Sequence, residues 1–252
     1  MTRILLTGHQ GYIGSHLLKR LNSTLGNISV CDLKSGEDFG DIRGQEYDVV
    51  IHLAASVSVM ASLEQPESYL ENNCYKVLRF LRNNRVGRFI FTSTGGAMYG
   101  NTRNASEDNA KWSNCLSPYA QSKYLAEQVI REMIPNHVIL RLGNVYGGDY
   151  SVRGEASVHA HFSSDNPILV YGGAQTRDFV HIDTVCQALI RALDCQPGTF
   201  NISSGSEQSI LSIAHEFSDQ RGVNVVIEPA RAGEVEYVSL DISRAKSVGL
   251  LR

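Results

Sequence analysis

The N-terminal stretch ILLTGHQGYIGSHLLKRL, residues 4–21, constrains the fold more than any other part of the chain. A short apolar strand leads into a turn that carries Gly8, Gly11 and Gly14, and an amphipathic helix follows. Glycine permits a tight turn, a close approach of the backbone to a pyrophosphate, and close packing of helix on strand. The N–H groups at the start of the helix would then face the phosphates. This GxxGxxG spacing is a variant of the dinucleotide-binding pattern, although an ordinary strand–turn–helix could also carry it.

A second strand, ISVCDL, strengthens the dinucleotide interpretation. It ends in Asp32, which lies 18 residues after Gly14. A carboxylate at this place binds the hydroxyls of the adenosine ribose, and its charge would repel a 2′-phosphate. The pattern therefore favours NAD over NADP, with Lys34 nearby as the one residue that keeps NADP open.

Strands and helices alternate through the following part of the chain. The strand segments are nearly continuous in hydrophobicity, as in parallel strands that are buried on both faces. We therefore predict an α/β fold with a doubly wound parallel sheet of the Rossmann type. The segments are a strand at 47–55, a helix at 66–84, a strand at 88–93, a helix at 119–133 and a strand at 137–143.

Composition excludes several classes of protein. The 252 residues are 42% apolar and carry a formal net charge of −3, which gives no basic surface for nucleic acid or for a membrane. No apolar run approaches the ~18–20 residues of a membrane span. Because RILLTG already fits a first strand and its turn, we expect no signal peptide.

The cysteines and histidines indicate no metal or redox site. Five cysteines are scattered without a CxxC pair, which is typical of reduced thiols in a cytoplasmic protein. His159 and His161 have no carboxylate or cysteine partners at ligand spacing, so we expect no metal.

The segment SPYAQSK, residues 117–123, supplies a candidate base. Ser117 and Pro118 suit the start of a helix, on which Tyr119 and Lys123 would stand one turn apart on the same face. Tyrosine has a pKa near 10, and a neighbouring ammonium favours tyrosinate by ~1.4 kcal/mol for each unit by which the pKa falls. An exposed helix can show the same spacing by chance, so the pair gains its weight from the glycine turn upstream.

The segment FTSTGGAMYG, residues 91–100, is a strand that ends in hydroxyls and glycines. Its hydroxyls could hold a substrate beside the tyrosine, with Thr94 the first candidate and Ser93 the second. The glycines also have a purely structural interpretation, because a Gly-Gly pair permits a sharp turn.

These motifs resemble the extended short-chain dehydrogenase/reductase family, in particular its NAD-dependent epimerase/dehydratase group, which acts on nucleotide sugars. The resemblance covers essentially the whole chain and is greatest to the UDP-glucose 4-epimerase-like members. The motifs that carry it are TGHQGYIG, DIRG, VIHLAA, FTSTGGAMYG, SPYAQSK, LRLGNVYG, TRDFVHIDTV and PARAGEV, in that order.

The resemblance implies a role for each matching residue. Tyr119 would be the catalytic base, Lys123 would tune it and hold the nicotinamide ribose, and Thr94 or Ser93 would hold the reacting hydroxyl. The cofactor residues would be Gly8, Gly11 and Gly14 at the pyrophosphate, Asp32 at the ribose, Asp41 and Ile42 at the adenine, and Ala54, Ala55 and Asn73 along the pocket. Asn144 would bind substrate, and Arg177 and Arg231 would grip its diphosphate, which suits the planar arginine fork.

The chain departs from the family pattern in two respects. After Asn73 the family usually has Val-x-Gly-Thr, whereas this chain has Cys74-Tyr75-Lys76-Val77, so we expect a difference in helix packing or at the dimer face. The chain is also short for the family, chiefly in loops and in the substrate lobe. We expect residues 1–145 and 172–203 to form the NAD-binding lobe, and residues 146–171 and 204–252 to form a reduced substrate lobe.

Residues 93–97, called the shelf below, indicate which reaction the protein would catalyse. Dehydratases of this family usually carry an Asp-Glu pair after the threonine, and related decarboxylases tend to carry a glutamate. Here Gly95, Gly96 and Ala97 cannot carry a proton, which favours epimerisation at C4 of a nucleotide sugar over dehydration. We expect this substrate to be a UDP-sugar. A reductase or dehydrogenase, or a non-catalytic NAD-binding protein, remains the alternative. The resemblance also implies a homodimer built by the helices at 68–84 and 119–133.

Overall fold

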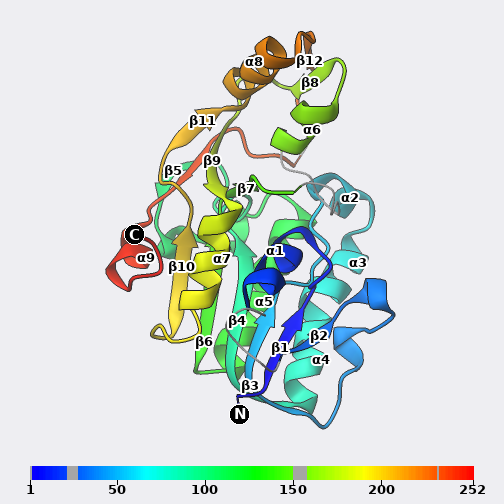
Figure 1. Cartoon of the computed structure of the whole chain (residues 1–252), viewed down its shortest axis with the longest axis vertical. Coiled ribbons are helices and arrows are strands. Elements are labelled where there is room, and N and C mark those ends of the chain that lie inside the picture. Colours follow the sequence, from blue (N-terminus) through cyan, green and yellow to red (C-terminus); the bar gives the residue numbers. More distant parts are fainter. Residues whose placement is uncertain (1, 22–27, 150–157, 232) are drawn as a thin grey trace.

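The computed structural model of the chain describes residues 2–21, 28–149, 158–231 and 233–252. Figure 1 shows a large lobe with a central sheet and, above it, a smaller lobe that contains α6, β8, α8 and β12. The smaller lobe lies beyond the carboxyl ends of the central strands, which is the edge where open α/β sheets bind their ligands.

The central sheet has six strands, and every neighbouring pair is parallel. The strand order is β10-β6-β4-β3-β1-β2, so β2 lies on one side of β1 and all later strands lie on the other, as in a doubly wound sheet. The predicted α/β fold is therefore confirmed. The strands are β1 (Ile4–Thr7), β2 (Ile28–Cys31), β3 (Glu46–His52), β4 (Arg85–Thr94), β6 (His137–Leu142) and β10 (Gly198–Ile202).

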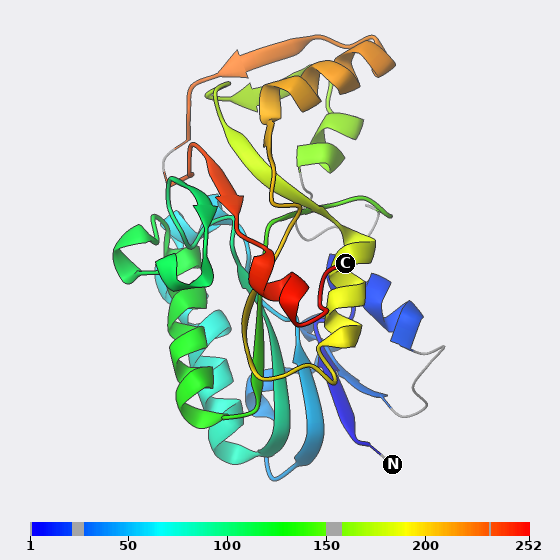
Figure 2. The ribbon, with the colours of Figure 1, turned by 90° about the vertical axis from the view of Figure 1, so that its left-hand side faces the viewer.

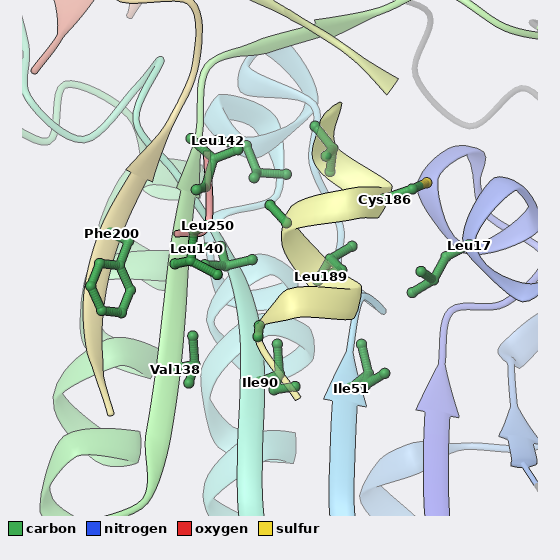
Figure 3. Packing of buried hydrophobic residues seen from close by; sticks show 14 of the residues in the cluster. Leu17, Ile51, Ile90, Val138, Leu140, Leu142, Cys186, Leu189, Phe200 and Leu250 are labelled. Atoms are coloured by element: carbon green, nitrogen blue, oxygen red, sulfur yellow. The ribbon is translucent and has the colours of Figure 1, made fainter. Parts of the chain in front are cut away.

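Both faces of this sheet are buried, which explains the continuous apolar strands in the sequence. Along β4, Ile90 packs into the core on one face, while Phe89 and Phe91 pack into the core on the other. Figure 3 shows the first face, where Leu17 and Leu189 reach toward the sheet from two helices. These helices are α1 (Tyr12–Leu21) and α7 (Ile182–Arg191).

The opposite face is covered by α4 (Lys76–Asn83) and α5 (Pro118–Met133), whose apolar side chains join the second core. The single helix predicted over 66–84 is wrong in one respect. The chain is helical there, but it divides into α3 (Pro66–Leu70), a π-helical turn η3 (Glu71–Tyr75) and α4. The π turn falls on Asn73, which is buried and hydrogen-bonded across to the neighbouring loop and helix. Such single turns inside helices occur frequently at functional sites.

The smaller lobe has a core of its own (Figure 2). A two-stranded parallel sheet, β8 (Ile168–Tyr171) with β12 (Val225–Glu228), packs against α6 (Val158–Ser164) and α8 (Ile210–Arg221). Three further strands, β7 (Asn144–Tyr146), β9 (Thr176–His181) and β11 (Glu207–Ser209), form a sheet in the order β11-β9-β7. The chain passes between the lobes along these strands.

The last residues return to the large lobe. Strand β13 (Val238–Leu240) pairs with β5 (Thr102–Ala105), and α9 (Ser243–Ser247) contacts β10. Ala245 and Leu250 are part of the core beneath α7. The predicted division of the chain between two lobes stays a prediction, and α9 with the residues after it is the part of the predicted substrate segment that packs on the central sheet.

No helix in the described ranges has both the length and the apolar character that a membrane crossing requires.

Candidate active site

A cavity of about 830 Å³ opens at the carboxyl ends of β1, β3, β4 and β6 and extends into the smaller lobe. Its lining residues come from segments that lie far apart in the sequence, from Gly8 to Val235. The predicted site residues that line it are Gly8, Gly11, Gly14, Asp32, Ala54, Ala55, Ser93, Thr94, Tyr119, Lys123, Asn144, Arg177 and Arg231.

Three predicted cofactor residues do not line this cavity. Asp41 is exposed, with its carboxylate 3.9 Å from the guanidinium of Arg43, and Ile42 packs against the core beneath α4. Asn73 is buried behind the wall, where its side-chain oxygen accepts the N–H of Ser56 at 2.8 Å and its nitrogen donates to Ser122 Oγ at 2.9 Å. Asn73 therefore holds the loop after β3 against α5, and the adenine role of the other two stays a prediction.

The glycine turn is packed backbone against backbone. Gly8 has φ +72°, and a Cβ there would lie 2.6 Å from the backbone nitrogen of Ala54. A Cβ on Gly14 would lie 2.1 Å from the carbonyl oxygen of Gly8. Neither neighbour can move without moving the sheet, so only glycine fits, and the turn keeps its surface open for a phosphate group.

Asp32 is held against this turn from the next strand. Its carboxylate accepts the backbone N–H of Gln10 and that of Lys34, both at 2.9 Å. The side chain of Lys34 reaches the carbonyl oxygen of Gln10 at 3.4 Å. The carboxylate thus stands fixed at the cavity wall beside the pyrophosphate turn, as an acceptor for ribose hydroxyls would.

The helix α5 begins as the sequence predicts. Ser117 caps it, with its hydroxyl accepting the N–H of Ala120 at 3.2 Å, and Pro118 occupies the first turn. Tyr119 is half-buried and lies edge-on to the ring of Tyr69, with ring centroids 6.4 Å apart. The first turn of α5 therefore presents the tyrosine at the cavity, with Lys123 one turn further along.

Lys123 is buried, and its Nζ lies 4.1 Å from the ring centroid of Phe91. Burial lowers the pKa of this lysine to about 7, while the carboxylate of Glu127 acts in the opposite direction. An ammonium in so dry a place can stabilise a neighbouring anion strongly, because water screens it little. Tyr119 and Lys123 together have the composition of a proton-transfer site.

The two hydroxyls at the end of β4 have different surroundings. Ser93 shares the face of Phe91, and its hydroxyl is buried near Glu127, whose pKa it helps to lower, without a hydrogen bond of ordinary geometry among the described residues. Thr94 lies at the end of the strand, where its hydroxyl accepts the N–H of Ala97 at 3.2 Å. Both residues border the cavity.

The glycine pair that follows leaves room for two distant side chains. A Cβ on Gly95 would lie 2.5 Å from Cδ1 of Leu240, and a Cβ on Gly96 would lie 2.9 Å from Oδ1 of Asn144. That amide oxygen is buried without a hydrogen-bond partner in the described part of the chain. A buried acceptor without a donor is costly, so its position suits a ligand hydroxyl.

Two arginines mark the far end of the cavity. Arg177 is buried, donates to the carbonyl oxygen of Thr176 at 2.9 Å and stands 3.9 Å from the Glu234 carboxylate. Burial lowers its pKa. The guanidinium carbon of Arg231 lies 3.4 Å from the ring centroid of Tyr171. The sequence analysis missed Glu234 and Tyr171 as cavity residues, although they lie within PARAGEV and just before GGAQTR.

A charged cluster behind Tyr119 and Lys123 was also missed. Glu127 is fully buried and bonded to Arg141, which lies inside the otherwise apolar strand HVILRL. An arginine in such a strand was the available signal, because buried charges are almost always paired. Within the described ranges, no group of three or more His, Cys, Asp or Glu side chains could hold a metal ion.

Comparison with known proteins identifies the family. The model of the NAD dependent epimerase/dehydratase family matches residues 4–203. The chain belongs to this family. The predicted family and the predicted NAD cofactor are thereby confirmed, and the glycine cradle with Asp32 beside it fits that cofactor.

The similarity extends over nearly the whole chain. A putative UDP-glucose 4-epimerase of Methanocaldococcus jannaschii is 34% identical over 282 aligned positions, which cover 98% of this chain and 92% of the relative. This alignment is longer than the 252 residues of the chain, so this chain lacks internal segments that the relative has.

Solved structures agree with this assignment. A UDP-glucose 4-epimerase of Thermotoga maritima with UDP-glucose has a TM-score of 0.85 at 28% identity, covering 98% of this chain and 92% of that one. A UDP-glucose 4-epimerase of Thermus thermophilus in complex with NAD has a TM-score of 0.86 at 26% identity, covering 99% and 93%.

Proposed function

We propose that this protein is a nucleotide-sugar epimerase that inverts C4 of a UDP-hexose through a transient 4-keto sugar. The observation that carries the proposal is the arrangement of one cavity: a dinucleotide cradle, a Tyr119–Lys123 pair and a hydroxyl shelf without a carboxylate all face it. Relatives named UDP-glucose 4-epimerase, one of them solved with UDP-glucose, support the substrate class.

The cofactor residues divide by the part of NAD that each would hold. Gly8, Gly11 and Gly14 would cradle the pyrophosphate, and Asp32 would accept hydrogen bonds from the adenosine ribose. Asp41 and Ile42 would flank the adenine, Ala54 and Ala55 would line the pocket, and Asn73 would hold the wall in place. When bound, NAD supplies the hydride acceptor and donor.

Tyr119 and Lys123 would carry the proton chemistry. Tyr119 as tyrosinate would take the proton of the sugar 4-hydroxyl and return it to the 4-oxygen once the keto sugar has turned to present the opposite face of C4 for reduction. Lys123 would stabilise the tyrosinate and hold the nicotinamide ribose. Thr94 is the better candidate for holding the sugar oxygen, because Ser93 faces Glu127 in the second core.

The nucleotide end would be held by charge. Arg177 and Arg231 would bind the diphosphate, for which a planar guanidinium supplies paired donors. Asn144 would direct its unpartnered amide oxygen at a sugar hydroxyl. The cavity of about 830 Å³ is large enough for both ligands to share it.

The shelf disfavours dehydration. A family dehydratase usually carries acids after the threonine, but here Leu240 and the amide of Asn144 fill the space that side chains on Gly95 and Gly96 would need. A reductase or dehydrogenase is a second candidate within the same site, and a non-catalytic NAD-binding protein a third, although such proteins typically lose the tyrosine or the lysine.

We further propose a cytoplasmic homodimer that contacts through α4 and α5. The exposed side of η3 and α4 carries Tyr75, which is 52% exposed, at a surface hollow of about 450 Å³. An exposed aromatic residue at a hollow is typical of a protein contact. The scattered reduced cysteines suit the cytoplasm.

The variant Tyr119→Phe tests the proposed function. It keeps the ring that packs against Tyr69 but removes the proton acceptor, so turnover of UDP-glucose and UDP-galactose should fall by about 10²–10⁴. NAD affinity, measured by calorimetry, should change little. Activity equal to that of the wild-type protein would refute the assigned base, and the absence of any turnover of a nucleotide-sugar panel by the wild-type protein would favour the binding-protein alternative.

A further inference from the structure

Lys123 is shielded from water, so solvation does little to stabilise its positive charge. Its side chain is buried, and its Nζ lies 4.1 Å from the ring centroid of Phe91 on β4. The titratable groups that face it are His52 from β3, and Tyr119 and Glu127 from its own helix. Of these, Glu127 is the source of negative charge at neutral pH.

His52 adds no charge to this balance. It is fully buried between the rings of Phe39 and Phe91, with Nδ1 2.8 Å from Thr7 Oγ1. Burial, together with the ammonium of Lys123, lowers the pKa of His52 to about 3. The histidine is therefore neutral over the whole working range of pH.

Glu127 stands one turn after Lys123 on α5 and is completely buried. Arg141 of β6 binds its carboxylate with both ends of the guanidinium fork, at 3.0 and 2.6 Å, and Arg131 binds it from the outer side at 2.7 Å. These arginines hold the pKa of Glu127 below its usual range, even though burial acts the other way. The carboxylate is thus a permanent negative charge at a fixed place.

Arg141 is itself held from the side of the shelf. It donates to the hydroxyl of Tyr99 at 2.9 Å and to the carbonyl oxygen of Glu107 at 2.6 Å. Tyr99 in turn donates to Asn201 of β10 at 2.5 Å. Strands β6 and β10, together with Tyr99 and the backbone of Glu107, therefore fix where the Glu127 carboxylate stands.

We propose that Glu127, clamped by Arg141, is a positioning residue that keeps the amine of Lys123 protonated inside the cavity wall. The inference deepens the proposed function and rests on it for its catalytic meaning, since a protonated Lys123 is what would stabilise the Tyr119 anion. Burial lowers the pKa of Lys123 to about 7 even with the opposing influence of the Glu127 carboxylate, so loss of that carboxylate should lower the pKa further.

The test compares Glu127→Gln with Glu132→Gln, a matched change on the exposed side of the same helix. The chain has six lysines, so ¹³C-lysine NMR resolves each titration, and a Lys123→Met spectrum assigns the resonance. We expect the Lys123 midpoint to fall by about 1–3 pH units in Glu127→Gln. Glu132→Gln should leave it in place, and Glu127→Asp, which keeps the charge, should restore most of it.

Two further arms separate a positioning role from a merely structural one. Glu127→Gln leaves Arg141 buried without its partner and can fail to fold. The double variant Glu127→Gln/Arg141→Met removes both charges, and it should fold yet still titrate Lys123 below the wild-type midpoint. An unchanged midpoint in Glu127→Gln, or a wild-type midpoint in the double variant, would overturn the inference.

Activity supplies an independent readout. Because the protonated lysine is the form required, activity should be lost as pH rises through its pKa, so the alkaline limb of kcat should move to lower pH by the same interval as the NMR midpoint. The NMR titration needs no sugar. A wild-type protein without epimerase activity would therefore sink the proposed function while leaving the lysine titration to decide the role of Glu127.

Discussion

The glycine turns after β1 and after β4 use glycine for different reasons. In the turn after β1, the glycines admit backbone: the atoms that a Cβ would strike belong to Gly8 and Ala54. In the turn after β4, Gly95 and Gly96 admit side chains, namely Leu240 from the last strand and Asn144 from β7. The first turn is packed by its own motif and the adjacent strand, whereas the second is packed by parts of the chain that lie far away in sequence.

This difference sets how each turn should tolerate change. A backbone neighbour belongs to a sheet and cannot give way, so a methyl group there displaces the helix. A side-chain neighbour can rotate, so the fold survives and the consequence is local. A substitution in the first turn should therefore disturb both the fold and cofactor binding. A substitution in the second turn should leave the fold intact and change substrate binding.

The largest effect is expected from Gly14→Ala. Its Cβ would lie 2.1 Å from the carbonyl oxygen of Gly8, so α1 must move away from the pyrophosphate cradle. NAD binding should weaken at least tenfold, about 1.4 kcal/mol, as measured by calorimetry.

The control for that variant is Gly222→Ala. Gly222 has φ +65° with no atom within 4 Å of the added carbon, so the variant should lose about 1–2 kcal/mol of unfolding free energy while binding NAD normally. Equal loss of NAD affinity in both variants would show that the first turn has no special relation to the cofactor.

A smaller and more local effect is expected from Gly96→Ala. The new methyl group would approach Oδ1 of Asn144 to 2.9 Å and turn the amide away, with the loss of about one hydrogen bond to the sugar. KM for the nucleotide sugar should rise about two- to tenfold while NAD affinity is kept. Asn144→Ala should give the same rise, and the double variant should add little to it. Independent, additive effects would contradict this account of the second turn.

What could be predicted from the sequence follows the same division. Gly8, Gly11 and Gly14 and the pair Tyr119–Lys123 are readable because turn and helix geometry fix their relations locally. Asp32 follows from its place at the end of the second strand, 18 residues after Gly14. Arg177 and Arg231 were assigned to the site from the family resemblance. No local sequence pattern indicates that residues so far apart in the chain line one cavity.

The parts that the sequence analysis missed depend on tertiary packing. The residues around Gly96 do not indicate its contact with Asn144, and those around Glu127 do not indicate its bond to Arg141. Both contacts join elements that are separate in the sequence. The π turn at Asn73 interrupts a stretch whose apolar spacing predicts one helix, and what accompanies it is a hydrogen bond to Ser122 on α5. Local patterns carry little information on such contacts.

The central claim is that the chemistry removes a hydride from C4 and returns it to the same carbon. UDP-glucose deuterated at C4 tests it most directly, with NAD bound to the protein and the products examined by NMR and mass spectrometry. We expect UDP-galactose of unchanged mass that retains deuterium at C4. A product lighter by one water would contradict it.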